Sequence, residues 1–168
     1  MPLSDTLARV DADLAAGRIP VARQRLRGLV SSFPNDLTLR RRLAETYRLY
    51  GESAEAGRWM YLEQDRDAAE TSAFEARYHT AQQRMRALAW RGREALARTT
   101  FAREQLVAVR AACSDAMGCP VDWDTVSSGE KEDSRRSGFA DFVAGAGCLV
   151  AVLVFFAIWV NGAVALFD

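Results

Sequence analysis

The fold is decided by residues 7–63, which read LARVDADLAAGRIPVARQRLRGLVSSFPNDLTLRRRLAETYRLYGESAEAGRWMYLE. Gly17 and Gly51 stand 34 residues apart in this stretch, and Ala22 and Ala56 repeat the same spacing. Each glycine follows one expected helix and precedes another. Thirty-four residues of helix–turn–helix is the period of tetratricopeptide repeats. The stretch therefore predicts two helical hairpins in tandem.

The hydrophobic pattern around this stretch is helical throughout. Apolar residues recur every three or four positions, and glycine and proline mark the boundaries. No run of alternating β-branched and aromatic residues indicates a strand. The expected helices run from Ser4 or Asp5 to Gly17, from Pro20 to Phe33, from Leu37 (with Asp36 as N-cap) to Tyr50, and from about Ser53 to Gln64. Their expected core positions are Leu3, Leu7, Val10, Leu14, Val21, Ala22, Leu26, Leu29, Val30, Phe33, Leu39, Leu43, Tyr47, Tyr50 or Leu49, Ala56, Trp59, Met60 and Leu62.

Residues 1–68 are interpreted as two degenerate tetratricopeptide-like repeats. Such a repeat needs a glycine between its two helices, a small residue where they approach, and a proline after the second helix. Gly17, Ala22 and Pro34 meet all three needs in the first unit. The second unit has the glycine and the alanine, but Ala68 stands where proline is expected. The alternative is an ordinary four-helix arrangement with a coincidental period.

The whole pattern resembles a family of small bacterial membrane proteins of unassigned function. In that family a tetratricopeptide-like N-terminal domain precedes one or two membrane spans. Residues 7–63 carry the resemblance, about the first half of the chain. The resemblance implies an all-α fold with a membrane segment, and it implies no reaction, cofactor or partner.

Residues 69–117 follow a seven-residue pattern. Two interleaved rows recur at this spacing: Phe74, Ala81, Leu88, Ala95, Ala102 and Val109, and Tyr78, Met85, Gly92, Thr99, Leu106 and Cys113. Such rows indicate a helical seam. The segment is either one long helix or a third helical hairpin broken near Gly92. In both cases it would cap the repeats, whose end unit otherwise exposes an apolar face. The seam could instead pair two chains as a homodimer.

Residues 118–138 and 139–167 differ sharply in composition. The first segment is rich in glycine, serine and opposed charges and predicts a flexible polar linker. Within it, Trp123 could either dock on the helical domain or lie near the lipid headgroups. In the second, residues 142–160 carry no charge, which is about the length needed to span a bilayer as a helix. A buried core helix and a removable targeting tail are the other interpretations of this stretch. Arg135 and Arg136 precede it and the N-terminus shows no signal peptide, so we expect a single-pass tail anchor in the inner membrane with residues 1–138 in the cytoplasm.

No group of residues predicts catalysis. His79 is the only histidine, and no phosphate-binding glycine loop precedes a helix outside the apolar segment. Cys113 and Cys119 are spaced poorly for zinc. We therefore expect a protein that is not an enzyme and that holds no cofactor or metal. Because 22 basic residues balance 22 acidic ones, no nucleic-acid partner is expected either.

A protein partner is the expected ligand. Tetratricopeptide repeats commonly bind peptides along the groove lined by the first helix of each repeat, and here that groove would contain Leu7, Asp11, Leu14, Arg41, Glu45, Arg48 and Leu49. Arg41 and Arg48 could hold a partner's carboxylates. The arginine clusters 23–27 and 40–42 either are solvated and pair across the helices, or contact anionic lipid or an acidic partner.

Three functions remain open at this point. The favoured one is a membrane-tethered scaffold or adaptor. The second is a small accessory subunit of an integral-membrane complex, in which Gly145, Gly147 and Ala151 form a small-residue packing face on the transmembrane helix. The third, which the near-neutral charge disfavours, is an arginine-rich regulatory or nucleic-acid-binding module.

Overall fold

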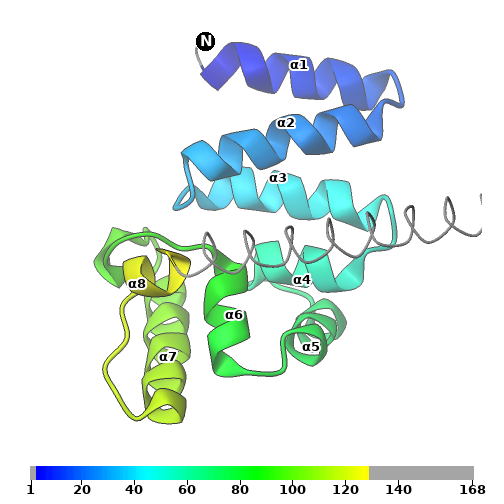
Figure 1. Cartoon of the computed structure of the whole chain (residues 1–168). Coiled ribbons are helices and arrows are strands. Elements are labelled where there is room, and N and C mark those ends of the chain that lie inside the picture. The colour runs from blue at the N-terminus through cyan, green and yellow to red at the C-terminus, as the bar shows by residue number, and fades with distance from the viewer. Residues whose placement is uncertain (1–2, 129–168) are drawn as a thin grey trace, which may run out of the picture. The chain divides into compact units, whose positions relative to one another are not determined.

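The computed structural model describes residues 3–128, and these residues form α-helices joined by short turns and one longer loop (Figure 1). The helices are α1 (Leu3–Ala15), α2 (Ile19–Ser32), α3 (Leu37–Arg48), α4 (Ser53–Met60), α5 (Ala68–Arg77), α6 (Ala81–Leu88), α7 (Thr100–Met117) and α8 (Trp123–Ser128). A single 3-10 turn, η1 (Glu94–Leu96), lies between α6 and α7. The all-α prediction is confirmed for this part of the chain.

The turns of the first four helices follow from local chemistry that the sequence displays. Gly17 and Gly51 both have φ of +70°, a left-handed conformation that costs glycine little, and each ends the first helix of a hairpin. Pro20 lies in the first turn of α2, where its missing N–H is not needed. The Asp36 carboxylate caps α3 by accepting from the backbone N–H groups of Thr38 and Leu39.

The first core lies between successive helices of the stack. α1 packs on α2, α2 on α3, and α3 on α4, as Figure 1 shows for the blue and cyan helices. The buried residues of this core are Val10, Ala22, Leu26, Leu29, Val30, Leu39, Leu43, Ala44, Tyr47, Ala56, Trp59 and Met60. Four predicted core positions are exposed instead: Val21, Phe33, Leu49 and Tyr50. Leu49 and Tyr50 lie outside because α3 ends at Arg48, two residues before the predicted end.

Gly57 allows a close approach of α4 and α5. A β-carbon at this position of α4 would lie 2.0 Å from the backbone oxygen of Glu70 in α5. Any larger residue would therefore push α5 away. This contact explains how α5 packs so tightly along α4.

The segment 69–117 corrects one prediction and refines another. It is not a single long helix, because residues 78–80 break it between α5 and α6. Thr80 caps α6, and Gln83 bonds back to the Thr80 backbone in a capping box. The alternative of a hairpin broken near Gly92 agrees better with the structure: α6 packs on α7 across a loop, residues 89–99, in which Gly92 has φ of +73°. α5 belongs to the packing of α4 instead.

The seven-residue rows lie inside the chain's own second core. Its buried residues are Tyr61, Leu62, Phe74, Met85, Ala87, Leu88, Trp90, Ala97, Ala102, Leu106, Val109, Cys113 and Trp123. Seven of the twelve members of the two predicted rows are in that set, so the seam is used within the chain. The two cores meet at the end of α4, where Met60 belongs to the first and Tyr61 to the second.

The linker was predicted to start at residue 118, but the folded unit continues beyond that residue. Trp123 in α8 is 1% exposed, and its indole N–H donates to a carboxylate oxygen of Glu94 at 3.0 Å. The buried Trp123 side chain and the hydrogen bond from the Gly92 N–H to Asp124 hold this six-residue helix against the domain. Residues 118–128 are therefore part of the folded unit, which corrects the prediction of a flexible tether over this range.

No helix within residues 3–128 is long and apolar enough to cross a bilayer. The predicted transmembrane helix at 139–167, with Gly145, Gly147 and Ala151, lies outside the described residues. Residues 129–138 of the predicted linker also lie outside the described residues.

Candidate functional site

The face predicted to bind a partner is crossed by ion pairs within the chain. Arg41 forms two hydrogen bonds of 2.7 Å to the Asp65 carboxylate, and Arg48 forms two, of 2.6 and 2.7 Å, to Glu70. Arg42 in α3 pairs with Asp11 in α1. These pairs join α1, α3 and the start of α5. The hydrogen bonds that Arg48 donates to Glu70 raise the pKa of Arg48, and the bonds from Arg41 lower the pKa of Asp65.

Two members of the predicted groove are presented to solvent without such a pair. Leu49 is 62% exposed, and Glu45 is exposed on the turn of α3 before it. Leu7 and Leu14 instead pack partly buried against the first core. A cavity of about 370 Å³ lies nearby, lined by Glu63, Gln64, Asp65 and Thr99. Arg41 contacts both of its carboxylates, so its charge is largely neutralised.

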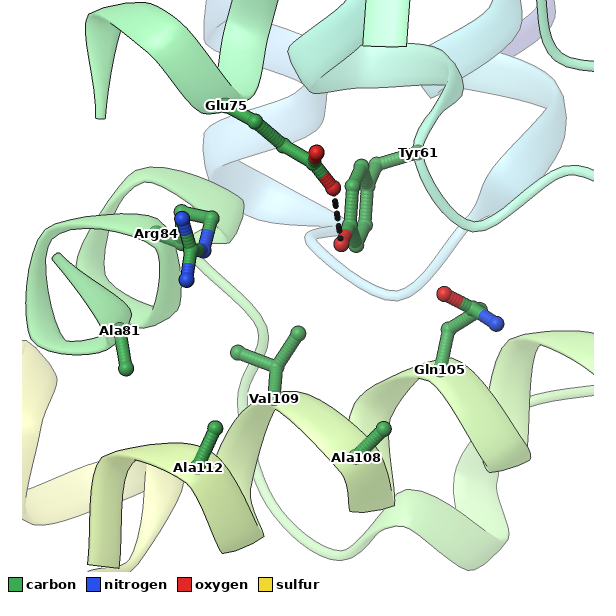
Figure 2. A pocket seen from close by; sticks show the side chains of 8 residues that line it. All are labelled: Tyr61, Glu75, Ala81, Arg84, Gln105, Ala108, Val109 and Ala112. Carbon is green, nitrogen blue, oxygen red and sulfur yellow. Dashed lines mark hydrogen bonds between the residues drawn. The ribbon is translucent and has the colours of Figure 1, made fainter. Parts of the chain in front are cut away.

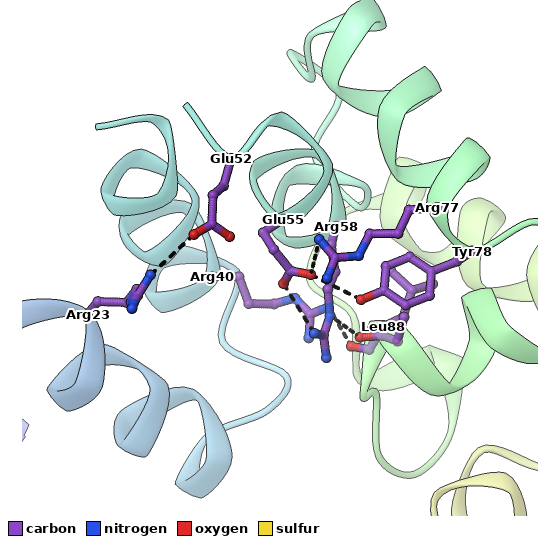
Figure 3. Close-up of polar contacts among 9 residues, drawn as sticks. Arg23, Arg40, Glu52, Glu55, Arg58, Arg77, Tyr78 and Leu88 are labelled. Carbon is purple, nitrogen blue, oxygen red and sulfur yellow. Dashed lines mark hydrogen bonds and ion pairs between the residues drawn. The ribbon is translucent and has the colours of Figure 1, made fainter. Parts of the chain in front are cut away.

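A buried arginine connects the two cores. Arg40 of α3 is completely buried, and its guanidinium donates to the backbone oxygens of Pro34 at 2.9 Å and Leu88 at 2.6 Å. The same group lies 5.1 Å from the ring centre of Trp59. Burial, with the nearby charge of Arg58, lowers the pKa of Arg40 to about 9. The bond to Leu88 holds the end of α6 beside α3 (Figure 3).

Glu55 of α4 is the centre of a second polar cluster, drawn in Figure 3. It is buried and accepts a hydrogen bond of 3.0 Å from the Tyr78 hydroxyl. Arg58 and Arg77 lie 3.3 and 3.7 Å from its carboxylate. Arg58 also donates to the backbone oxygen of Ala87 in α6. These contacts fix α4, α5 and α6 relative to one another.

A cavity of about 190 Å³ lies between these helices and α7 (Figure 2). α5 packs on α4 while α6 packs on α7, and the two pairs leave space between them. The lining residues are Tyr61 after α4, Glu75 of α5, Ala81 and Arg84 of α6, and Gln105, Ala108, Val109 and Ala112 of α7. Glu75, Ala108 and Ala112 are exposed, so the cavity is open to solvent.

The cavity has a polar wall and an apolar floor. The Tyr61 hydroxyl donates to Glu75 at 3.0 Å, and burial, together with the Glu75 charge, raises the pKa of Tyr61. Arg66 donates to the Gln105 side-chain oxygen at 3.1 Å, which orients that amide. Three alanines and Val109 form the floor. The volume is below that of pockets that bind drug-sized ligands, and it suits a single side chain with an apolar stem and a polar tip.

Sequence reasoning did not single out this cavity. Its residues come from four separate segments and share no spacing, and the sequence predicted Ala81 and Val109 only as members of the seam. The small residues Ala108 and Ala112, four apart on one helix face, are the one local signal that could have drawn attention to α7.

The residues considered for chemistry lie apart. His79 is exposed in the turn after α5, whereas Cys113 is buried in α7, and burial raises the pKa of its thiol. Within residues 3–128 no three His, Cys, Asp or Glu side chains are grouped so that they could hold a metal ion.

Comparison with known proteins identifies a family. No curated protein and no solved structure matches the chain. The model of a family of unknown function, DUF6584, matches residues 1–168, the whole length of the sequence. The chain therefore belongs to the DUF6584 family.

Proposed function

We propose that this protein is an adaptor that binds a segment of a protein partner and is held at the cytoplasmic face of a membrane by residues 142–160. The observation that carries the proposal is the cavity between α5, α6 and α7. It offers one side-chain-sized site with hydrogen-bonding groups on its wall. Such a site fits an anchor residue of a bound protein segment.

The frame around the cavity supports binding without large rearrangement. Arg40 and Arg58 both donate to backbone oxygens at the end of α6, which holds that helix in place. Tyr61 is fixed by its bond to Glu75. A site whose walls are already ordered loses less entropy when a ligand binds.

The arrangement of α1 to α4 supports a tetratricopeptide-like interpretation. Gly17 and Gly51 have the same left-handed conformation at the spacing of that repeat. Helical repeats of this kind present extended surfaces for binding other proteins. Glu45 in α3 and Leu49 directly after it are exposed and would add a secondary contact that binding at the cavity does not require.

Attachment to a membrane would compensate for a small contact. One anchor side chain and a short adjoining surface give modest affinity, but tethering raises the effective concentration of a partner in the same membrane. The uncharged stretch 142–160 is long enough for that role.

Site-specific photocrosslinking tests the proposal. A photoreactive amino acid replaces Ala108 on the cavity floor of the full chain, and crosslinks are formed in native membranes. We expect a discrete protein adduct from this position. The matched control places the same amino acid at Val107, which is also exposed on α7 but does not line the cavity.

A second variant fills the cavity. Ala112→Trp adds a large side chain at an exposed floor position, so the domain should fold while the site is blocked. We expect the Ala108 adduct to disappear in this background. An adduct of equal yield from Val107, or one that survives Ala112→Trp, contradicts binding at the cavity.

A further inference from the structure

We infer that the cavity between α5, α6 and α7 takes a glutamine side chain of the bound protein segment and recognises the carboxamide at its tip. This inference rests on the proposed function and deepens it by naming the chemistry of the anchor residue. It follows from the orientation of the polar groups on the cavity wall and from the charges that surround them.

The Tyr61 hydroxyl faces the cavity as a hydrogen-bond acceptor. Its proton is committed to Glu75, which it meets at 3.0 Å. Because an ionised carboxylate has no proton to donate, Tyr61 must be the donor of this bond, and its oxygen keeps a lone pair for a ligand. No donor within residues 3–128 uses that lone pair. In Figure 2 the Tyr61 hydroxyl points into the cavity.

Gln105 presents a second acceptor. Its side-chain oxygen accepts from Arg66 at 3.1 Å, and a guanidinium has donors only, so this bond identifies the oxygen end of the amide. A carbonyl oxygen has two lone pairs, and Arg66 occupies one of them. Figure 2 shows the oxygen of Gln105 on the side nearer Tyr61, with the nitrogen turned away. The wall thus has two oxygen acceptors whose orientation is set before a ligand binds.

Arg84 supplies a donor on the opposite side of the cavity (Figure 2). One of its terminal nitrogens donates to the backbone oxygens of Tyr78 and His79, at 3.4 and 3.3 Å. Its other N–H groups donate to no atom of the part of the chain that the structure describes. A ligand group that lies across the cavity can therefore donate to the two acceptors and accept from Arg84.

A primary carboxamide has this pattern of groups. Its nitrogen carries two N–H donors, one for each oxygen acceptor, and its carbonyl oxygen accepts from Arg84. A hydroxyl tip has one donor and one oxygen atom, so it cannot serve both sides of the cavity at once. Each wall group that a ligand removes from water without bonding to it weakens binding, so the tip that satisfies all three groups is favoured.

The charges around the cavity favour a neutral tip. Glu75 and Arg84 line the cavity with opposite charges, and neither forms an ion pair within residues 3–128. Arg66 adds a second positive charge beside Gln105. An ammonium or guanidinium tip would approach two arginines. A carboxylate tip would approach Glu75 and would bring no donor for the two oxygen acceptors.

The floor fits the stem of glutamine. Ala81, Ala108 and Ala112 end at their β-carbons, and together with Val109 they form an apolar surface below the polar wall. Two methylene groups that lie on this surface are removed from water, which favours binding. Asparagine offers only one methylene group, so glutamine is the carboxamide residue that uses both the floor and the wall.

A set of four small compounds tests the inference. They are N-acetyl-glutamine N-methylamide and its norleucine, glutamate and lysine counterparts, which share one backbone and differ only in the side chain. Dissociation constants are measured at neutral pH by titrating the isotope-labelled full chain in detergent micelles, from chemical-shift changes of the amides of residues 105–112. We expect the glutamine compound to bind about ten-fold more tightly than each of the others, because only its side chain pairs with every wall group.

Tyr61→Phe removes one acceptor and keeps the ring. The glutamine compound should then bind about ten-fold more weakly, whereas the norleucine compound should bind at least as tightly as before. Tyr78→Phe is the matched control, because the Tyr78 hydroxyl also donates to a glutamate at 3.0 Å but does not line the cavity. This control should bind the glutamine compound as the parent does, which separates recognition in the cavity from the loss of a tyrosine–glutamate bond elsewhere.

Equal binding of the glutamine and norleucine compounds overturns the inference, as does tighter binding of the glutamate or lysine compound, or the absence of shifts with all four. An equal loss of affinity in Tyr61→Phe and Tyr78→Phe also overturns it. The Ala108 crosslink reports on the proposed function separately: a chain that forms that adduct but does not prefer the glutamine compound contradicts only the identity of the anchor residue.

Discussion

Arg40 shows how a buried charge can organise this domain. A base whose pKa is lowered on folding binds its proton more weakly in the folded state, so burying this charge costs stability at neutral pH. The bonds to Pro34 and Leu88 and the face of Trp59 offset that cost. Through these contacts one side chain joins the α2–α3 turn, α4 and the end of α6.

Replacing Arg40 with Met should destabilise the domain. The change leaves two backbone oxygens without their donor, which we expect to lower the free energy of unfolding by about 2 kcal/mol after the gain from removing a buried charge. Urea unfolding of the full chain in detergent micelles, followed by circular dichroism, measures this. Arg27→Met, an exposed change on α2, should stay within about 0.5 kcal/mol of the parent. A more stable Arg40→Met protein would contradict the role given to these bonds.

The lowered pKa of Asp13 predicts how the stability of the domain changes at acid pH. It occupies the position 34 residues before Tyr47, yet it is buried, and hydrogen bonds from Arg25 and Arg18 lower its pKa below the usual 3.8. A carboxyl whose pKa is lowered on folding contributes stability above its unfolded pKa and loses it as pH falls through the folded pKa.

Melting temperatures between pH 5 and pH 2.5 test this. The parent should lose stability as the pH falls below about 4, and Asp13→Asn should start lower but decline less over the same range. Asp115→Asn, on the exposed end of α7, should follow the parent curve. Parallel curves for the parent and Asp13→Asn would show that the carboxylate does not stabilise the fold.

At the scale of elements, the contact of α4 with α5 depends on one glycine. Gly57→Ala would place a β-carbon within 2.0 Å of the α5 backbone, so the helices must separate, at a cost of about 1–3 kcal/mol or more. Gly28→Ala is the matched control, because nothing lies within 4 Å of its β-carbon in α2. That change should raise stability by about 0.5–1 kcal/mol. Equal effects from the two substitutions, measured by chemical unfolding, would contradict the packing.

α8 should behave as part of the domain. Trp123→Ala removes its buried anchor and should cost about 3 kcal/mol of unfolding free energy, whereas Trp123→Phe keeps most of the packing and loses the bond to Glu94, about 1 kcal/mol. Thermal unfolding measures both losses, and the melting temperature of Trp123→Ala should be the lower of the two. If Trp123→Ala unfolds at the parent temperature, α8 is not held against the domain.

The starts and turns of the first four helices were predictable because their signals are local, whereas α3 and α4 end two and four residues before their predicted ends at Tyr50 and Gln64. Gly17, Gly51, Pro20 and Asp36 each act on their own turn, and the structure uses all four as expected. The break between α5 and α6 was missed because Thr80 and Gln83 form its capping box in a stretch without glycine or proline. The seven-residue rows also continue across that break, which made one long helix look plausible.

The cavity and the docking of α8 could not be predicted in the same way. Both depend on contacts between distant segments: Arg40 with Leu88, Arg58 with Ala87, and Trp123 with Glu94. No spacing in the sequence predicts which backbone carbonyl a buried arginine will donate to. The predicted groove was reasonable from the repeat pattern, but the chain's own acids pair with Arg41 and Arg48, which only the folded structure reveals.

At the scale of the described unit, two cores share one helix. α4 contributes Met60 to the first core and is followed at once by Tyr61, which belongs to the second and lines the cavity. Changes in the packing of α1 to α4 can therefore reach the cavity through α4. The predicted groove and the cavity lie on elements that this helix connects, so they offer two surfaces for one partner or two separate ones.

Quantitative crosslinked pull-down of the full chain from native membranes distinguishes these surfaces. Ala112→Trp blocks the cavity, and Glu45→Ala/Leu49→Ala removes the exposed side chains of the predicted groove without breaking an ion pair of the described residues. The account predicts that the partner captured by the parent is lost with Ala112→Trp and retained with Glu45→Ala/Leu49→Ala. Retention with Ala112→Trp and loss with Glu45→Ala/Leu49→Ala would contradict it and identify the groove as the binding surface.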